Sequence, residues 1–158
     1  MADALLVLMK KKDFNKITID EIVTLAGVNR STWFRNFKTK SDALTFKLVM
    51  MWNKWADDND LQDRNRYTGT KIESFFAFCL SVRDIIDSVY EAGQKNCIYD
   101  AYYEVMASFT GNNQAELYFA RFCCFGLVGV LDGWRERDFA ETPEELAAII
   151  NNGGRPMA

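Results

Sequence analysis

Residues 17–44 carry the pattern that most constrains this chain, because two short amphipathic segments are separated by a single glycine. Thr18 and Glu21 form a capping box: the Thr hydroxyl accepts a hydrogen bond at a helix start, and the Glu side chain reaches back. Gly27 stands where a helix commonly ends in the left-handed conformation. Asn29 is a good N-cap for a second helix directly after the turn. The spacing therefore predicts a helix-turn-helix, whose second helix enters the major groove of DNA.

The two predicted helices should present one face to a core and another to DNA. Trp33 and Phe37 lie four residues apart, so they share one side and should pack inward on Ile22 and Leu44. The opposite side carries side chains able to reach base edges: Arg30, Ser31, Thr32 and Arg35. An arginine at this point can form a bidentate pair with guanine, worth about 1–3 kcal/mol of discrimination. A solvated surface arginine is the alternative for Arg30, and base stacking is the alternative to a core role for Trp33.

The charge of the chain is unevenly distributed. Residues 1–54 carry ten Lys and Arg against five acids, whereas the remaining residues carry nine against seventeen. A basic head on an acidic body indicates a polyanionic partner for the head alone. The run Lys10–Lys12 has two readings that stay open, because it either complements a helix dipole or lies near phosphate.

Helical periodicity over long proline-poor stretches predicts an all-α chain. Apolar residues make up 49% of the sequence and only two prolines occur. A helix-turn-helix DNA-binding domain is expected at residues 1–46 and a helical dimerisation and effector-binding domain at 47–158. Helices are expected at residues 2–12, 19–26, 30–37, 40–55, 70–92, 97–109, 114–137 and 143–150, with a linker at 57–69 and a sharp turn at 110–113. Thr142, Pro143 and Glu145 mark the start of the last helix.

The sequence offers little for catalysis or metal binding. It has no histidine, no C-x-x-C pair and no phosphate-binding loop, so we expect no enzyme activity, no catalytic residues, no metal and no cofactor. The four cysteines fit reduced, buried thiols, with a thiol sensor at Cys123–Cys124 as the alternative. No apolar run reaches membrane-spanning length and no signal peptide is apparent, so a cytoplasmic protein that contacts no membrane is expected.

The order of these motifs resembles the tetracycline-repressor (TetR) family of bacterial transcription regulators. The similarity covers residues 2 to about 48 and rests on ITIDEI followed by AGVNRSTWFRNFKTKSDAL. The tail GLVGVLDGWRERDFAETPEELAAII is similar to a subgroup that includes dihydroxyacetone-kinase regulator-like proteins. The resemblance implies an all-α homodimer that binds a double-stranded operator and receives a signal in its body.

The resemblance also implies roles for individual residues of the head. Bases would be read by the recognition helix, here Arg30, Ser31, Thr32 and Arg35, with Phe34 and Asn36 at positions that contact DNA in the family. Phosphates would be bound by Thr18 and Lys40. The chain departs from the family where Phe34 replaces the usual tyrosine, where Asn36 replaces His or Tyr, and where a basic N-terminal arm is expected to be absent.

Glycines in the body indicate where two copies would meet. Gly126, Gly129 and Gly133 fall on one face of the helix expected at 114–137. Glycine costs about 1 kcal/mol relative to alanine inside a helix, so three on one face indicate close approach of another backbone. Two such helices, each beside the helix at 143–150, predict a four-helix homodimer interface. Close packing within one subunit is the alternative.

Aromatic side chains concentrate in the body and predict a ligand cavity there. Phe78, Tyr102, Met106 and Phe122 are the expected lining, because a tyrosine hydroxyl can bind a polar group of an otherwise apolar ligand. The sequence thus favours a homodimeric, sequence-specific repressor, switched by a small-molecule or protein effector whose signal passes along the helix from Ser41 to Trp55. The rival is a TetR-like protein-interaction module that does not bind DNA, which Phe34 and the missing arm favour.

Overall fold

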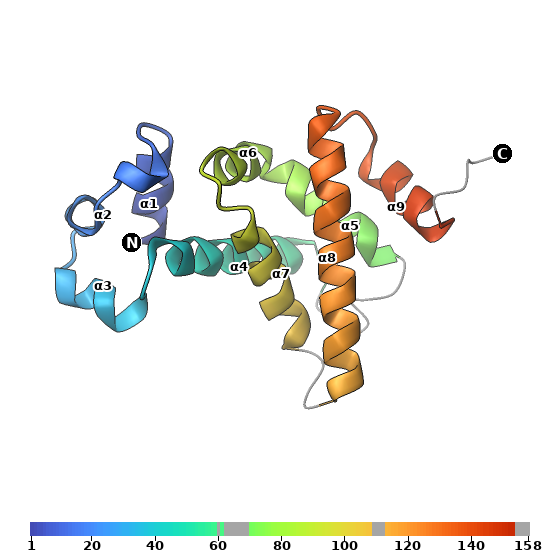
Figure 1. The fold of residues 1–158 in the computed structure, drawn as a ribbon, viewed down its shortest axis with the longest axis horizontal. Coiled ribbons are helices and arrows are strands. Elements are labelled where there is room, and N and C mark those ends of the chain that lie inside the picture. The colour runs from blue at the N-terminus through green and yellow to red at the C-terminus, as the bar shows by residue number, and fades with distance from the viewer. Residues whose placement is uncertain (60, 62–69, 109–112, 154–158) are drawn as a thin grey trace. The chain divides into compact units, whose positions relative to one another are not determined.

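The computed structural model describes residues 1–59, 61, 70–108 and 113–153, and every regular element in that part of the chain is a helix (Figure 1). The all-α prediction is therefore confirmed. The elements are α1 (Ala2–Met9), the 3-10 helix η1 (Phe14–Lys16), α2 (Ile19–Ala26), α3 (Arg30–Asn36), α4 (Lys40–Asp58), α5 (Thr70–Ser81), α6 (Arg83–Glu91), α7 (Asn96–Ala107), α8 (Gln114–Glu136) and α9 (Pro143–Asn151).

The chain divides into two compact units, which are described separately. Unit 1 contains residues 1–53 and 84–105, and unit 2 contains residues 54–83 and 106–158. This division differs from the expected boundary at residue 46, because residues 84–105 belong with the N-terminal helices. Three contacts explain the difference. The Ser41 hydroxyl donates to the Gln94 amide oxygen at 2.6 Å, the Cys97 thiol lies 3.6 Å from the Ser41 carbonyl, and the Trp52 and Tyr102 rings meet edge-on.

Local signals place α2 and α3 where the sequence predicts them, whereas α1 ends at Met9, three residues before the expected end at residue 12. The capping box of α2 is formed, with the Glu21 N–H donating to the Thr18 hydroxyl at 3.2 Å and the Thr18 N–H donating to the Glu21 carboxylate at 2.8 Å. Gly27 ends α2 with a φ of 66°. Helix α2 packs against both α1 and α3. The core beneath them includes Leu5, Ile22, Trp33, Ala43 and Leu44, all fully buried.

Unit 2 is organised around Trp134 of α8. Its ring packs edge-on against Phe76 and Phe139, and its indole N–H donates to the Glu141 carbonyl at 3.0 Å. Helix α9 packs on α5 and begins with the expected capping box of Thr142 and Glu145.

Two expectations for the helices need correction. The single helix expected at residues 70–92 is wrong, because the chain breaks at Val82 between α5 and α6. The Ser81 hydroxyl donates to the Phe78 carbonyl at 2.7 Å, and the same carbonyl also accepts the Val82 N–H at 3.2 Å. Of the linker expected at 57–69, residues 57 and 58 instead continue α4, and residues 60 and 62–69 lie outside the described part. Most of the turn at 110–113 lies outside it as well.

Helix α8 also corrects the expectation about membrane-spanning length. It has 23 residues and is long and apolar enough to cross a membrane by length and composition alone. A core helix meets the same criterion, and 33% of the most apolar window of α8 is buried inside the protein.

The bond between Ser41 and Gln94 gives a direct test of the composition of unit 1. We expect a double-mutant cycle of Ser41→Ala and Gln94→Ala to show a coupling of about 0.5–1.5 kcal/mol in the free energy of unfolding, measured by chemical denaturation. Each variant removes the same partly buried hydrogen bond. The control cycle pairs Gln94→Ala with Ser31→Ala, at an exposed position of α3. Additivity in both cycles would contradict the assignment of residues 84–105 to the N-terminal unit.

Candidate nucleic-acid interface

Trp33 determines which side of α3 faces outward. Its side chain is fully buried, and its ring centroid lies 5.2 Å from that of Phe37, which in turn lies 5.6 Å from that of Phe46. A base-stacking role for Trp33 is therefore incompatible with its position. The residues of α3 that remain exposed are Arg30, Ser31, Phe34, Arg35 and Asn36, while Thr32 is half-buried.

The exposed polar side chains of α3 are linked to one another around Thr32. The Arg35 guanidinium donates to the Thr32 hydroxyl at 3.3 Å, and the Asn36 amide donates to the Thr32 carbonyl at 2.7 Å. These bonds lie at the solvent-exposed surface, so they orient the side chains without closing them off from a ligand. Five of the eight predicted DNA contacts thus lie together on one exposed helix face.

Arg30 lies between an acid and an aromatic ring. Its Nη1 is 2.5 Å from Oδ1 of Asp20, in the first turn of α2, and both side chains are more than half exposed. The guanidinium carbon also lies 5.5 Å from the centroid of the Phe34 ring, one turn further along α3. Residues of two helices therefore set the direction of the side chain expected to read bases.

Both residues expected to bind phosphate, Thr18 and Lys40, make hydrogen bonds within unit 1. The Thr18 hydroxyl is part of the α2 cap. The Lys40 ammonium donates to the carbonyls of Phe14 and Ile17 at 2.5 and 2.8 Å and lies 4.6 Å from the centroid of the Phe14 ring. Burial lowers the pKa of Lys40. Through these contacts Lys40 holds the η1 segment against the start of α4.

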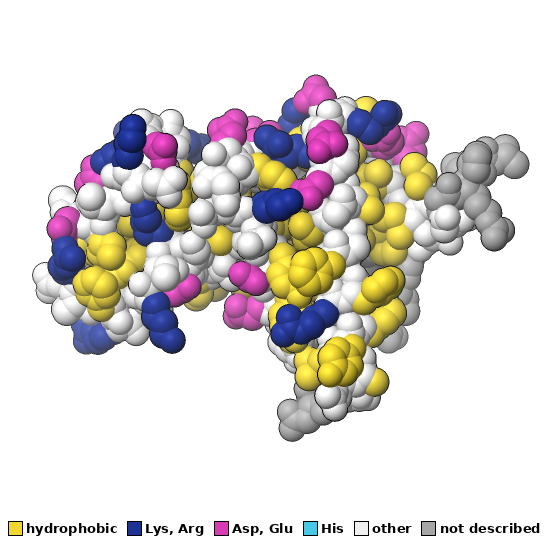
Figure 2. Space-filling view, viewed as in Figure 1, with side chains coloured by type: hydrophobic (Ala, Val, Ile, Leu, Met, Phe, Trp, Pro, Cys, Tyr) yellow, Lys and Arg dark blue, Asp and Glu magenta, His cyan; other side chains and the backbone are white. Residues whose placement is uncertain are grey.

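Other basic side chains stay exposed on unit 1. They are Lys10, Lys11, Lys16, Lys38 and Lys95. Figure 2 shows Lys and Arg side chains distributed around an apolar patch over α2 and α3. Phe34 contributes to the apolar surface of this unit, with 54% of its area exposed. The surface therefore combines exposed Lys and Arg side chains with the exposed side of α3.

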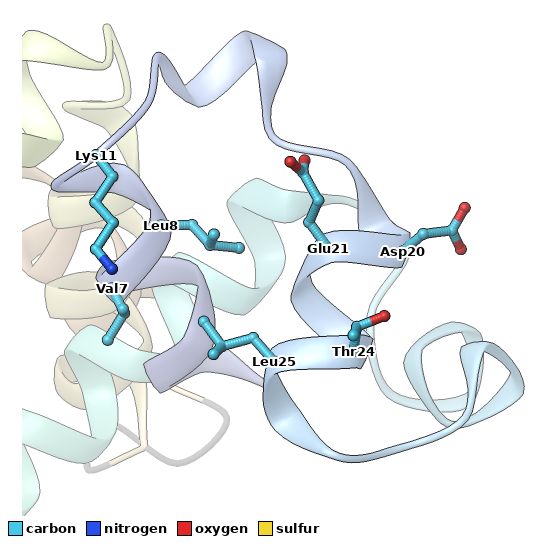
Figure 3. Close-up of a pocket in the computed structure, with 7 residues that line it drawn as sticks. All are labelled: Val7, Leu8, Lys11, Asp20, Glu21, Thr24 and Leu25. Carbon is cyan, nitrogen blue, oxygen red and sulfur yellow. The ribbon is translucent and has the colours of Figure 1, made fainter.

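A shallow hollow of about 470 Å³ separates α1 from α2 (Figure 3). Its floor is apolar, with Leu8 and Leu25 pointing toward each other, and Asp20 and Glu21 stand on its α2 side. Asp20 directs its carboxylate away from α1. The hollow is therefore an apolar groove beside the candidate interface, and its acidic edge does not suit an anionic ligand.

Of the four residues expected to line an effector cavity, three are buried and one is exposed. Tyr102 is buried in unit 1, whereas Phe78 and Met106 are buried in unit 2. Phe122 is 74% exposed on α8, so its ring does not belong to the interior of unit 2. The effector cavity stays a prediction from sequence.

The glycines of α8 face open space within the chain. A Cβ built on Gly126, Gly129 or Gly133 meets no described atom within 4 Å beyond the backbone of its own helix. The described part of the chain therefore gives no support to the alternative of close packing within one subunit. Large aromatic side chains are exposed on the same helix: Tyr118, Phe119, Phe122 and Phe125.

The cysteines are in apolar surroundings. Burial raises the pKa of all four thiols, that of Cys124 to about 12. Because the thiolate is the reactive form, this environment does not support a thiol sensor at Cys123–Cys124. Among the residues that the structure describes, no group of three or more Cys, Asp or Glu is placed to hold a metal ion.

No known family model matches this chain, and no curated protein matches it significantly. The resemblance of the head to TetR regulators therefore rests on its own motifs.

Two residues of the interface escaped the sequence analysis. Asp20 is ten positions from its partner Arg30, and Phe14 is 26 positions from Lys40. Neither pair has a local spacing that would reveal it, because the turn and the packing of η1 bring the partners together. The only sequence signal was the acidic first turn of α2, which equally fits the helix dipole.

The Glu21 carboxylate makes the stability of this region depend on pH. Hydrogen bonds from Lys12, at 2.6 Å, and from Thr18 lower the pKa of Glu21 from 4.5 to about 2. A carboxyl whose pKa is lower in the folded state stabilises the fold above its unfolded pKa, and this contribution is lost as pH falls. We expect thermal unfolding of the wild type to lose stability between about pH 5 and pH 2, and Glu21→Gln to flatten that loss.

Glu91→Gln, at an exposed position of the same unit, is the control for this titration. Equal slopes for wild type and Glu21→Gln would show that the Lys12 and Thr18 bonds do not hold the carboxylate in solution.

Proposed function

We propose that this protein is a sequence-specific DNA-binding transcription regulator, a repressor of the TetR type that acts as a homodimer. The observation that carries the proposal is the orientation of α3. Trp33 is fully buried, and Arg30, Ser31, Phe34, Arg35 and Asn36 are exposed on the remaining surface of the helix. A short helix anchored in this way, after a tight glycine turn, has the form that enters a major groove.

The exposed face of α3 has the chemistry needed for base recognition. Arg30, at the first residue of the helix, can bind the O6 and N7 atoms of guanine in a bidentate pair. Phe34 offers an apolar contact for a thymine methyl group, which does not need the hydroxyl of the family's tyrosine. Because backbone carbonyls engage Lys40, we assign the phosphate contacts to the exposed Lys16 and Lys38 instead.

The rival function is a protein-interaction module that does not bind DNA. It is supported by the exposed apolar side chains of unit 1, above all Phe34 and the groove residues Val7 and Leu25. Such side chains also occur at protein interfaces. Selection of bound duplexes from a random pool separates the two functions, because the regulator enriches a palindrome and the interaction module enriches no sequence.

Arg30→Ala tests base recognition directly. We expect the variant to lose about 1–3 kcal/mol of discrimination at one base pair of the selected palindrome, because one bidentate pair is removed. Binding of the wild type should also weaken steeply as salt rises. Lys16→Ala is the matched control, expected to weaken binding about equally for all sequences. If Arg30→Ala behaves like Lys16→Ala, Arg30 contacts phosphate instead of a base.

The exposed surface of α8 supports the proposal of a homodimer. Its aromatic residues occupy the N-terminal half of one helix face, and its glycines occupy the C-terminal half of the same face. An antiparallel pair of α8 helices about a twofold axis near Phe125 and Gly126 would place Phe122 of one copy over Gly129 of the other. Because a twofold interface uses the same patch twice, Tyr118, Phe122 and Phe125 of each copy would then lie opposite Gly133, Gly129 and Gly126 of the other.

Gly129→Leu distinguishes dimerisation from folding. A side chain at this position meets open space inside the subunit, and replacing a helical glycine removes a cost of about 1 kcal/mol, so the subunit should stay folded. We expect the variant to be monomeric by light scattering, with helicity unchanged by circular dichroism. Glu104→Leu, at an exposed position of α7, should leave the oligomeric state unchanged. A dimeric Gly129→Leu variant would place the interface elsewhere.

The regulatory signal has a direct path along the chain. Helix α4 begins at Lys40 in unit 1 and ends at Asp58 in unit 2, so the boundary between the units falls within one continuous helix. We propose that an effector bound to unit 2 acts on the DNA-binding face through α4. Such an effector shifts the equilibrium only as far as its affinities for the two states differ.

A further inference from the structure

We infer that Asp20 is a specificity-determining residue: with the ring of Phe34, it holds Arg30 so that contact with DNA depends on the base instead of the phosphate. The inference rests on the proposed function and assigns a role to a residue outside the recognition helix.

The position of Asp20 is set by α2. It is the second residue of that helix, where a negative charge suits the helix N-terminus. Its carboxylate projects away from α1 (Figure 3) and meets Nη1 of Arg30 at 2.5 Å. The capping of α2 does not use Asp20, because Thr18 and Glu21 supply it.

The ion pair contributes little to folding. Both side chains are more than half exposed, with 57% of Arg30 and 66% of Asp20 accessible. Exposed pairs are weak because water screens the charges and two long side chains lose freedom. The pair is therefore better explained by what it does to Arg30 than by what it does to the fold.

Orientation is the first effect on Arg30. A guanidinium has five N–H donors in a fixed plane, so one edge can be held by a carboxylate while another stays available. The Phe34 ring, 5.5 Å from the guanidinium carbon, limits movement on a second side. A planar fork that is already directed loses less freedom on pairing with guanine.

Discrimination is the second effect. The Asp20 carboxylate offsets the charge of Arg30 and repels phosphate oxygens, so it weakens the electrostatic part of binding that is independent of sequence. A bidentate pair with guanine depends on geometry and is retained. Asp20 should therefore lower the affinity for all DNA and lower it most where no guanine is available.

Asp20→Asn tests this role because it removes the charge and keeps the size of the side chain. Binding is measured to the selected palindrome and to a scrambled duplex of equal length, across a salt series. For the variant we expect about three- to tenfold tighter binding to the scrambled duplex at low salt, a smaller gain for the palindrome, and a log–log salt slope steeper by about 0.9.

Two matched variants separate the role of the charge from other effects. Asp20→Glu keeps the charge and should keep the wild-type slope and selectivity. Asp3→Asn removes the acid of another exposed ion pair of unit 1, with Lys47 at 2.6 Å, and should change neither quantity. A purely structural role of Asp20 would alter the unfolding temperature without altering the salt slope.

The outcomes distinguish the inference from the proposed function. If wild type binds the palindrome and Asp20→Asn shows the same slope and the same ratio of affinities, the inference is overturned and the proposed function stands. If no variant binds any duplex at low salt, both are overturned, since Arg30 then has no base to read.

Discussion

The burial of Trp33 is the interaction on which the proposed DNA-binding face depends. Helix α3 has only seven residues, which is too short to be stable alone, and the side chain of its N-cap Asn29 makes no capping hydrogen bond. The indole N–H of Trp33 has no hydrogen-bond partner in the described part of the chain, so its contribution is apolar packing. A fully buried tryptophan contributes about 3–5 kcal/mol relative to alanine, which exceeds the helical propensity of so short a segment. The outward direction of Arg30 is therefore a consequence of packing beneath the helix.

The acidic first turn of α2 connects the elements around this anchor. Glu21 accepts from Lys12, which follows α1, while Asp20 meets Arg30 at the start of α3. Neighbouring carboxylates of one helix thus bind both adjacent segments, and the helix dipole favours each of them. Lys40 completes the arrangement by holding two carbonyls of the η1 region. Part of the charge that the sequence places in a basic head therefore holds the backbone in place. That backbone carries the remaining basic side chains.

Whether a feature could be predicted from sequence depends on how far apart along the chain the residues that form it lie. Both capping boxes and the left-handed Gly27 were predicted, because each is determined within four residues. The break at Val82 was not predicted, because the apolar pattern over residues 70–92 continues through it. The grouping of residues 84–105 with the head depends on Ser41 and Gln94, 53 positions apart. The same limit applies to the site: the exposed face of α3 follows from periodicity, whereas the partners of Arg30 and Lys40 follow from the tertiary fold.

Helix α8 shows what the single chain leaves unexplained. Its inner face is closed by Cys124, Leu131 and Trp134, which are almost fully buried. On its outer face three glycines have no packed neighbour among the residues that the structure describes, although each costs about 1 kcal/mol relative to alanine. Within the subunit alanine would fit at all three positions, so nothing in the fold requires glycine there. Exposed aromatic rings in the N-terminal half of this face and glycines in its C-terminal half are the reason for proposing a second copy of α8, packed antiparallel, as its partner.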